Sequence, residues 1–304
     1  MQLLCLLLGT DFFADIPERM ADMTKLLAAV VIGVAGLIGG VLLARLAAPW
    51  LHAAGGDAAA AIHTSSSVFA TAIAVGVFLV IVHVLAAVLA KIIGTNPALF
   101  VAGVSVAALT SHMGTAERFA AQHGSQLGMI VELAGLAVVC ALLQTIVFRA
   151  GAPSSSAKVA SHTAQTSQPR SVGTWCALAV ASIFALTIMW LVARCSLTGQ
   201  VVAAATLGAV GATVLTSLVV GRGCERVLYS VPLLALVCVH VITLFVFQDD
   251  PRLLPLFRIM PLHCLAGAMM GTALGVGWAG TLLEGSTENA VAALQADDQP
   301  GSDA

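Results

Sequence analysis

Charged residues are scarce in this sequence of 304 residues, because Asp, Glu, Lys and Arg together make up only 9% of it. Hydrophobic residues make up 59%, and the mean hydropathy is +1.00. A chain this apolar cannot stay in water as an ordinary globular domain, and its length allows about eight membrane-spanning helices with short loops. The net charge of -2 provides no basic surface for DNA or RNA, so we exclude nucleic acids as partners.

Several signatures of catalytic and structural sites are also missing. The seven cysteines have no CxxC spacing, and their odd number argues against an ectodomain held by disulfides. No HxxxH or HxxE cluster is present, so we expect no metal site. We expect no enzyme either, because the sequence lacks a nucleophile elbow and paired carboxylates. Residues 3–8 are too short, and too poor in basic neighbours, for a signal peptide.

Long apolar stretches predict an all-α integral membrane bundle of seven or eight spans. The third span is the doubtful one, because its apolar part at residues 98–109 is followed by polar residues such as His112 and Glu117. A kinked, tilted or re-entrant element is the alternative there. The predicted spans are residues 24–48, 67–93, 98–117, 126–149, 174–196, 200–220, 227–247 and 261–283.

The chain divides into five predicted regions. Residues 1–23 mix acidic and apolar side chains and predict an interfacial amphipathic segment, with a disordered N-terminus as the alternative. Residues 24–149 and 174–283 form two membrane halves. Residues 150–173, which are rich in Ser, Thr, Gln, Ala and Pro, predict a flexible linker between them. Residues 284–304 are acidic and predict a disordered tail.

Basic residues predict the orientation of the chain in the membrane. With eight crossings, both termini lie on one side, and that side carries more Lys and Arg than the other. The positive-inside bias then places both termini in the cytoplasm, in a cytoplasmic (inner) membrane.

Two short motifs recur in the same register and suggest an internal repeat. The sequence VIVHV ending at Val84 recurs as VCVHV ending at Val241, and the tetrad MGTA begins at Met113 and again at Met270. Spans one to three would then correspond to spans six to eight in the opposite orientation, as in many transporters with a site near the membrane midplane. The alternative is that both halves draw by chance on the same apolar residues.

The first of these motifs carries a histidine in both copies, His83 and His240, in the middle of an apolar span. An ionisable side chain is costly in hydrocarbon and usually faces a partner, a cavity or a cofactor. One interpretation is proton or ion handling, because imidazole titrates near neutral pH. Another is that the two histidines bind a b-type haem across the bundle. The structural interpretation is a neutral ring bonded to a backbone carbonyl or a hydroxyl such as that of Thr243.

Glu132 is the only carboxylate inside a clearly predicted span. It lies about one turn into the fourth helix, where its side chain could reach the interface. The functional alternative is a protonatable site, paired with His112, His123 or Arg118.

Glycines at four-residue spacing predict close helix crossings, within the fold or between subunits. Gly267, Gly271 and Gly275 form such a row in the last span, and Gly36 and Gly40 lie in the first. Small residues at this spacing let two helix backbones approach, and van der Waals contact then holds them together. A pore-lining role for these smooth faces is the alternative.

Residues 24–125 carry a further pattern. It consists of the sequence LLAA at residues 26–29, Gly36, LAR at 43–45, Asp57, a second span ending at Gly94, and AGVSVAA at 102–108. This order of features resembles the transmembrane part of the small-conductance mechanosensitive channel family and its relatives with a conserved, repeated transmembrane helix. The resemblance implies an oligomeric channel or tension-responsive protein, with Gly103, Ala107, Ala108 and Gly114 on the pore face. The family's soluble β-rich domain has no counterpart here, and a span with Glu132 stands in its place.

The leading functional hypothesis is therefore a channel or transporter for a small solute or ion, in which His83, His240 and Glu132 carry the function. The first alternative is a non-catalytic membrane subunit that packs into a larger complex through its glycine rows. A redox subunit that binds haem or quinone comes third. The expected partners are the lipid bilayer and either further copies of the chain or other membrane subunits.

Overall fold

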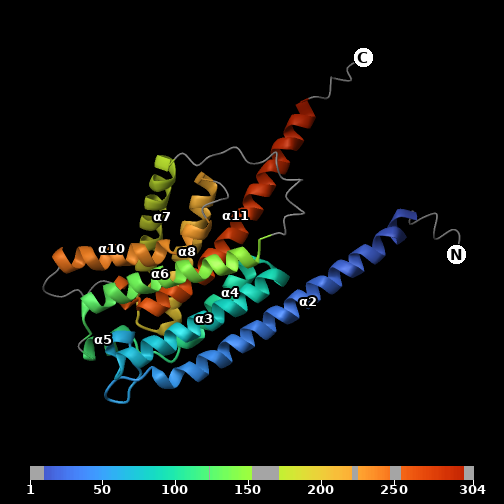
Figure 1. Ribbon diagram of the computed structural model, residues 1–304. Coiled ribbons are helices and arrows are strands. Elements are labelled where there is room, and N and C mark those ends of the chain that lie inside the picture. Colours follow the sequence, from blue (N-terminus) through green and yellow to red (C-terminus); the bar gives the residue numbers. More distant parts are fainter. Residues whose placement is uncertain (1–9, 123, 153–170, 221–224, 247–254, 298–304) are drawn as a thin grey trace.

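The computed structural model describes residues 10–122, 124–152, 171–220, 225–246 and 255–297 (Figure 1). In this part of the chain the fold is helical, and an isolated bridge between His52 and Ala58 is its only strand-like pairing. The long helices are α2 (Thr10–Ala47), α3 (Val68–Ile93), α4 (Thr95–Thr110), α6 (Gln126–Ala150), α7 (Ser171–Val192), α8 (Thr198–Val220), α10 (Val231–Val246) and α11 (Pro261–Asp297). The short ones are η1 (Ala48–Trp50), η2 (Ile62–Thr64), α5 (Ala116–Ala121), α9 (Glu225–Leu228) and η5 (Pro255–Arg258).

Six of the described helices are long and apolar enough to cross a membrane, and they belong to α2, α3, α6, α7, α8 and α11. The other two long helices, α4 and α10, have 16 residues each. A helix of that length rises about 24 Å, which is less than the bilayer's hydrocarbon thickness of about 30 Å. The chain therefore has the helices of a multi-pass membrane protein, and two of its helices are short for a full crossing.

Local residues explain where several helices begin and end. Gly94, with a φ of +89°, lets the chain turn directly from α3 into α4. The Ser125 hydroxyl accepts a hydrogen bond of 2.9 Å from the Gly128 backbone N–H and so caps α6. Pro261 begins α11, a position at which proline's missing N–H costs nothing.

The most buried helices are α4, α8 and α11. The helix α11 packs against α8 on one side and α4 on another, while α4 also contacts α2 and α3. The helix α6 packs against both α3 and α10, and α7 packs against α8. The buried core is therefore centred on α11, and α2, α3, α6 and α7 lie around it.

Both terminal helices are longer than the predicted spans. The helix α2 begins at Thr10, so residues 10–23 are helical and continuous with the first apolar span. The helix α11 continues to Asp297, well beyond the predicted end at residue 283. The added residues of α11 are rich in Ala, Leu, Glu and Gln, which are good helix formers. Residues 1–9, 153–170 and 298–304, and with them most of the predicted linker, lie outside the described residues.

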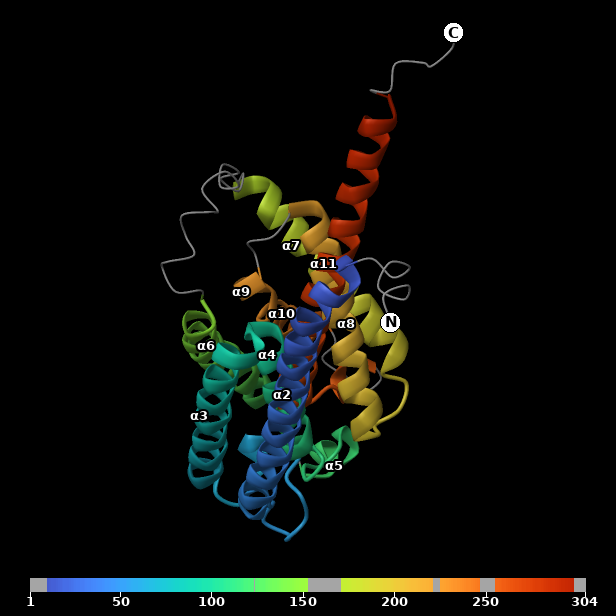
Figure 2. The ribbon, with the colours of Figure 1, turned by 90° about the vertical axis from the view of Figure 1, so that its right-hand side faces the viewer.

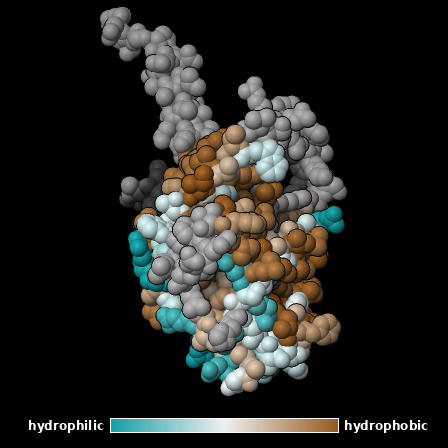
Figure 3. All heavy atoms as spheres, turned by 90° about the vertical axis from the view of Figure 1, so that its left-hand side faces the viewer, coloured by the Kyte–Doolittle hydropathy of each residue, from teal (hydrophilic) through white to brown (hydrophobic). Residues whose placement is uncertain are grey.

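The outer surface is apolar along the helices. Large hydrophobic side chains are exposed on α2, α3, α6, α7 and α10, as expected for surfaces in contact with lipid. Figure 3 shows one such face, with hydrophilic residues gathered mainly towards its lower end. Figure 2 shows α5 at the end of the bundle opposite the projecting end of α11. The polar end with α5 also holds the connection between α2 and α3.

The two MGTA tetrads of the proposed repeat have different structures. Residues 113–115 lie in the turn between α4 and α5 and Ala116 begins α5, whereas residues 270–273 lie inside α11. The alignment suggested by the sequence therefore pairs a turn with a helix at this point, and the internal repeat stays a prediction.

Candidate functional site

The connection between α2 and α3, residues 51–67, folds back into the end of the bundle. Its first part is a tight hairpin in which the Ala53 N–H donates to the Asp57 carbonyl at 2.7 Å, and Gly56 has a φ of +82°. The Ala59 N–H then donates to the Leu51 carbonyl at 2.9 Å. Beyond the hairpin, Ala59, Ala60 and Ala61 are completely buried. We call residues 51–67 the inserted segment.

Burying non-helical backbone requires partners for its polar groups, and Gln122 supplies two of them. The Gln122 side chain, just after α5, donates through Nε2 to the Ala58 carbonyl at 3.1 Å. Its Oε1 accepts from the Ala60 N–H at 3.2 Å. Gly114 also contributes, because its N–H donates to the Ala59 carbonyl at 2.9 Å. A Cβ at Gly114 would lie 2.8 Å from the Ala58 oxygen, so only glycine fits this close approach.

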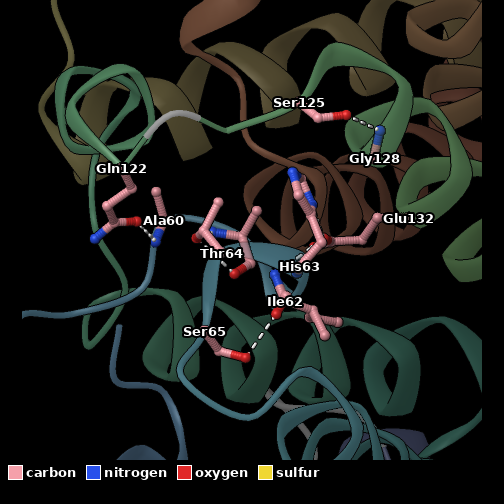
Figure 4. A network of polar contacts seen from close by, with 10 residues as sticks. Ala60, Ile62, His63, Thr64, Ser65, Gln122, Ser125, Gly128 and Glu132 are labelled. Carbon is pink, nitrogen blue, oxygen red and sulfur yellow. Dashed lines mark hydrogen bonds and ion pairs between the residues drawn. The ribbon is translucent and has the colours of Figure 1, made fainter. Parts of the chain in front are cut away.

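Glu132 on α6 holds the next part of the inserted segment (Figure 4). Its Oε2 accepts hydrogen bonds from the Ile62 N–H at 2.9 Å and the His63 N–H at 3.4 Å. It also lies 3.1 Å from His63 Nδ1, and this contact becomes an ion pair when the imidazole is protonated. One carboxylate oxygen therefore meets three N–H groups of two adjacent residues.

Close packing fixes the position of the His63 ring. The Phe119 ring of α5 meets it edge-on, with ring centroids 5.5 Å apart. A Cβ at Gly128 of α6 would lie 2.6 Å from His63 Cδ2, so the ring fills the space above this glycine. Nearby, Ala60, Met129 and Met260 form a small buried apolar cluster. The pair His63–Glu132 is thus enclosed by α5, α6 and the chain just before α11.

Two polar atoms of this pair have no hydrogen-bond partner among the described residues. They are Glu132 Oε1 and His63 Nε2, and both atoms are buried. The Glu132 side chain as a whole is only 6% exposed, compared with 21% for His63. A buried carboxylate oxygen without a donor costs free energy, so such atoms are candidates for binding a further hydrogen-bonding group.

Glu132 was singled out by the sequence, but its partner was not. The expected partners Arg118 and His112 are exposed, no contact of either with Glu132 is found, and His123 lies outside the described residues. The partner is His63, from a loop that the sequence left without a role. A run of four alanines, residues 58–61, directly precedes Ile62 and His63, and it is too short for a span and too apolar for an exposed loop. That run is the signal that could have pointed to an inserted segment.

His83 lies in the buried face of α3. Its Nδ1 donates to the Leu79 carbonyl, one helical turn earlier, at 2.8 Å. This is the structural interpretation considered for the sequence, in which the ring bonds to a backbone carbonyl of its own helix. The other ring nitrogen, Nε2, is buried without a partner among the described residues.

His240 is completely buried on α10. Its ring packs edge-on against the Phe257 ring, with centroids 4.4 Å apart. Gln126 Nε2 donates to the His240 carbonyl at 3.0 Å and to the Thr243 hydroxyl oxygen at 2.9 Å. The Thr243 hydroxyl donates to the Val239 carbonyl at 2.9 Å. Thr243 therefore bonds to backbone and not to the His240 ring, whose two nitrogens have no partner in the described part of the chain.

The structure does not bring His83 and His240 into contact. They belong to α3 and α10, and α6 packs against both of these helices. A haem bound by both histidines would therefore have to reach from α3 to α10 past α6. Among the described residues, no group of three His, Cys, Asp or Glu side chains is placed to hold a metal ion.

Four of the predicted glycines, Gly103, Gly267, Gly271 and Gly275, lie at contacts between helices, whereas Gly114 lies in the turn after α4 against the inserted segment. A Cβ at Gly103 of α4 would lie 2.7 Å from Met270 Cγ of α11, so α11 covers the α4 face that the channel resemblance assigns to a pore. The row in α11 faces α8: a Cβ at Gly267 would lie 2.7 Å from the Thr206 nitrogen, and one at Gly275 would lie 2.7 Å from Thr213 Cβ. Gly271, between them, meets Ala209 at the same distance.

Comparisons with known proteins give no relatives for this chain. No family model, curated protein or solved structure matches it. The resemblance of residues 24–125 to mechanosensitive channel helices is therefore neither supported nor refuted, and the function must be argued from the site itself.

Proposed function

We propose that this multi-pass membrane protein is a channel or transporter for a small ion, and that Glu132 with His63 handles the ion. The observation that carries the proposal is the state of the Glu132 carboxylate. One oxygen holds the inserted segment through three N–H groups, while the other is buried without a partner among the described residues.

The cost of burying such a group supports a functional role. An ionisable side chain in an apolar span is expensive, and intramembrane carboxylates commonly mark ion or proton pathways. A carboxyl group that served only to hold the inserted segment could do so as a neutral amide, because a glutamine oxygen also accepts hydrogen bonds. The charge is therefore the property that needs an explanation, and ion handling provides one.

The position of Glu132 near the start of α6 also supports the access of ions from one end of the bundle. Glu132 is six residues after the first residue of α6, which corresponds to a depth of about 9 Å along the helix. The inserted segment that covers it lies at the end of the bundle with α5 (Figure 2). An ion would therefore reach Glu132 from this end when the segment moves. His83 and His240 remain candidates for the rest of the pathway.

The test is ion flux in proteoliposomes that contain the purified protein. Glu132→Gln keeps the size and the hydrogen-bond acceptor but removes the charge, so we expect flux to fall at least about tenfold, equivalent to about 1.4 kcal/mol of barrier. Gln144→Met is the matched control, because Gln144 is a buried polar residue of the same helix that donates only to Cys140 Sγ. Its flux should match that of the unaltered protein. Unchanged flux in Glu132→Gln would refute the proposal.

One observation favours the second candidate, a non-catalytic subunit of a membrane complex. Most hydroxyl groups inside the described spans bond to carbonyls of their own helix instead of lining a shared path, as Ser105, Ser182, Thr206 and Thr216 do. A subunit of this kind would co-purify with fixed partners from its native membrane at constant stoichiometry. It would also show no flux alone.

A further inference from the structure

We propose that the ion bound at Glu132 is the proton, and that its binding at Oε1 releases the inserted segment from α6. The inference rests on the proposed function in one respect, since it takes Glu132 as the ion-handling group. It goes further in naming the ion and the movement that follows its binding.

Leu51 anchors the start of the inserted segment in the apolar core, whereas the stretch that Glu132 and Gln122 hold, residues 58–63, is attached mainly by polar contacts. The fully buried side chains of that stretch are alanines, and an alanine methyl buries much less apolar surface than a leucine or valine side chain. The side chains that hold its backbone from outside are Gln122 and Glu132, and Glu132 alone meets three of its N–H groups. Weakening the contacts of one carboxylate therefore removes a large part of the attachment.

The geometry around Oε1 fits a proton and not a metal cation. Hard cations such as Ca²⁺ and Mg²⁺ take about six or more oxygen ligands. Near Glu132 the described residues offer a single free carboxylate oxygen, and no group of three His, Cys, Asp or Glu side chains exists among them. A proton needs only one lone pair, which Oε1 provides.

Protonation changes the strength of the contacts at the other oxygen. When hydronium gives a proton to Oε1, one O–H bond of the hydronium breaks, an O–H bond to Oε1 forms and a water molecule is released, so the carboxylate becomes a neutral acid. Oε2 is then a carbonyl oxygen, so its bonds to Ile62 and His63 lose their charge assistance. Charge-assisted hydrogen bonds are roughly twice as strong as neutral ones. The attachment is therefore strong at high pH and weakens as the pH falls.

His63 opposes the release until Glu132 itself is protonated. A protonated imidazole forms an ion pair with the ionised carboxylate through Nδ1, and this ion pair strengthens the contact. The histidines on helices packed against α6 are His83 on α3, His240 on α10 and His263 on α11, and no contact of these with Glu132 is found among the described residues. Lys91 and Arg149 lie in the last turns of α3 and α6, away from Glu132 near the start of α6. The short helix α9 also contacts α6, and Tyr229, the residue directly after α9, packs against Phe148 in the last turn of α6, far from Glu132.

Amide hydrogen exchange tests the release directly. The full-length protein in lipid nanodiscs is measured at a series of pH values between about 8 and about 4.5. After correction for intrinsic exchange, we expect protection of residues 59–65 to fall at least about tenfold over this range. Protection that stays constant would overturn the inference.

Three variants test whether the Glu132 carboxylate causes the loss of amide protection with falling pH. Glu132→Gln imitates the protonated acid, so its segment should be weakly protected at every pH. Gln122→Leu removes the other attachment, so protection should be lower throughout but should still fall with pH. His63→Asn keeps a side-chain N–H donor without the positive charge, so release should occur at a higher pH than in the unaltered protein. A pH dependence that survives in Glu132→Gln would overturn the inference, even if the variant were less stable.

The outcomes also separate this inference from the proposed function. Loss of protection with falling pH, in a protein that carries no proton flux in liposomes, would keep the release and refute transport. Flux that depends on Glu132 while protection stays constant with pH would keep transport and refute the release. Equal flux of Na⁺ or K⁺ and of protons would refute the proton as the ion.

Discussion

At Gly128 the lack of a side chain makes room for the His63 imidazole. The ring lies where a Cβ would be, and Phe119 closes its other side. The ring is therefore held in the orientation that directs Nδ1 to Glu132. This glycine is a positioning residue for the pair, although it has no functional group of its own.

We expect Gly128→Ala to destabilise the protein by about 1–3 kcal/mol, as overpacking of a buried contact does. The added methyl would lie 2.6 Å from His63 Cδ2, so the ring must move. Gly135→Ala is the control, because the same helix leaves that position with no atom within 4 Å of an added Cβ. There, alanine should be neutral or stabilising by about 0.5–1 kcal/mol. Unfolding in detergent micelles, followed by circular dichroism, measures both, and equal stability of the two variants would contradict the packing argument.

The sequence predicts the importance of single residues better than their partners. Glu132 stands out because it is a carboxylate in an apolar span, a property visible without any contact. Its partner His63 could not be predicted in the same way, because it lies in a loop and is 69 residues away along the chain. The same holds for Gln122, whose role depends on a backbone segment folding back onto it.

The crossing of α8 and α11 is the most extensive contact between the described helices. Positions along the two helices pair in increasing order, with Gly267 beside Ala205 and Thr206, and Gly275 beside Val210 and Thr213. The two helices therefore run in the same direction. Close backbone contact of this kind supplies van der Waals energy where the surrounding lipid gives no hydrophobic drive.

For this crossing we expect Gly271→Ala to lower stability by about 1–3 kcal/mol. The added Cβ would lie 2.7 Å from Ala209 Cβ and would also meet the Thr206 backbone, which cannot move aside as a side-chain end can. Gly277→Ala, on the same helix with no atom within 4 Å, serves as the control. Thermal unfolding in detergent measures both variants, and we expect the melting temperature to fall in Gly271→Ala but not in Gly277→Ala. An equal loss of stability in both variants would mean that alanine destabilises α11 at any glycine position, and would contradict the importance of the close crossing.

Helix positions were largely predictable, whereas the faces that meet were not. The predicted spans 67–93, 126–149 and 200–220 agree closely with α3, α6 and α8. Length and hydropathy determine such elements, since each must bury about 20 apolar residues in hydrocarbon. The same apolar composition on every face hides which side contacts protein and which contacts lipid. Hydropathy predicted neither the start of α10 after a turn nor the inserted segment, because a turn within an apolar run leaves the hydropathy unchanged.

At the scale of the whole molecule, the order of helices predicts on which side each connection lies. The inserted segment and the residues after α6 lie at opposite ends of the bundle, because α3, α4 and α6 follow one another with short connections. We expect Gly55→Cys and Ala152→Cys, in a background without the native cysteines, to react with an impermeant maleimide from opposite sides of the membrane. The positive-inside bias predicts that Ala152→Cys reacts from the cytoplasm. Labelling of both from one side would contradict the order of crossings.

The parallel course of α8 and α11 also constrains the lipid around the protein. The chain leaves α8 at one end of the bundle and must return to the other before α11 begins, and α10 is the long helix described on that path. Its exposed side chains include Leu234, Ile242 and Phe245, so the described part of α10 presents an apolar surface. A crossing made by these 16 residues alone would be about 6 Å shorter than an average hydrocarbon core. We therefore expect the protein to be more stable in bilayers of shorter-chain lipids than in thicker ones, as its thermal unfolding in vesicles of different chain length would measure.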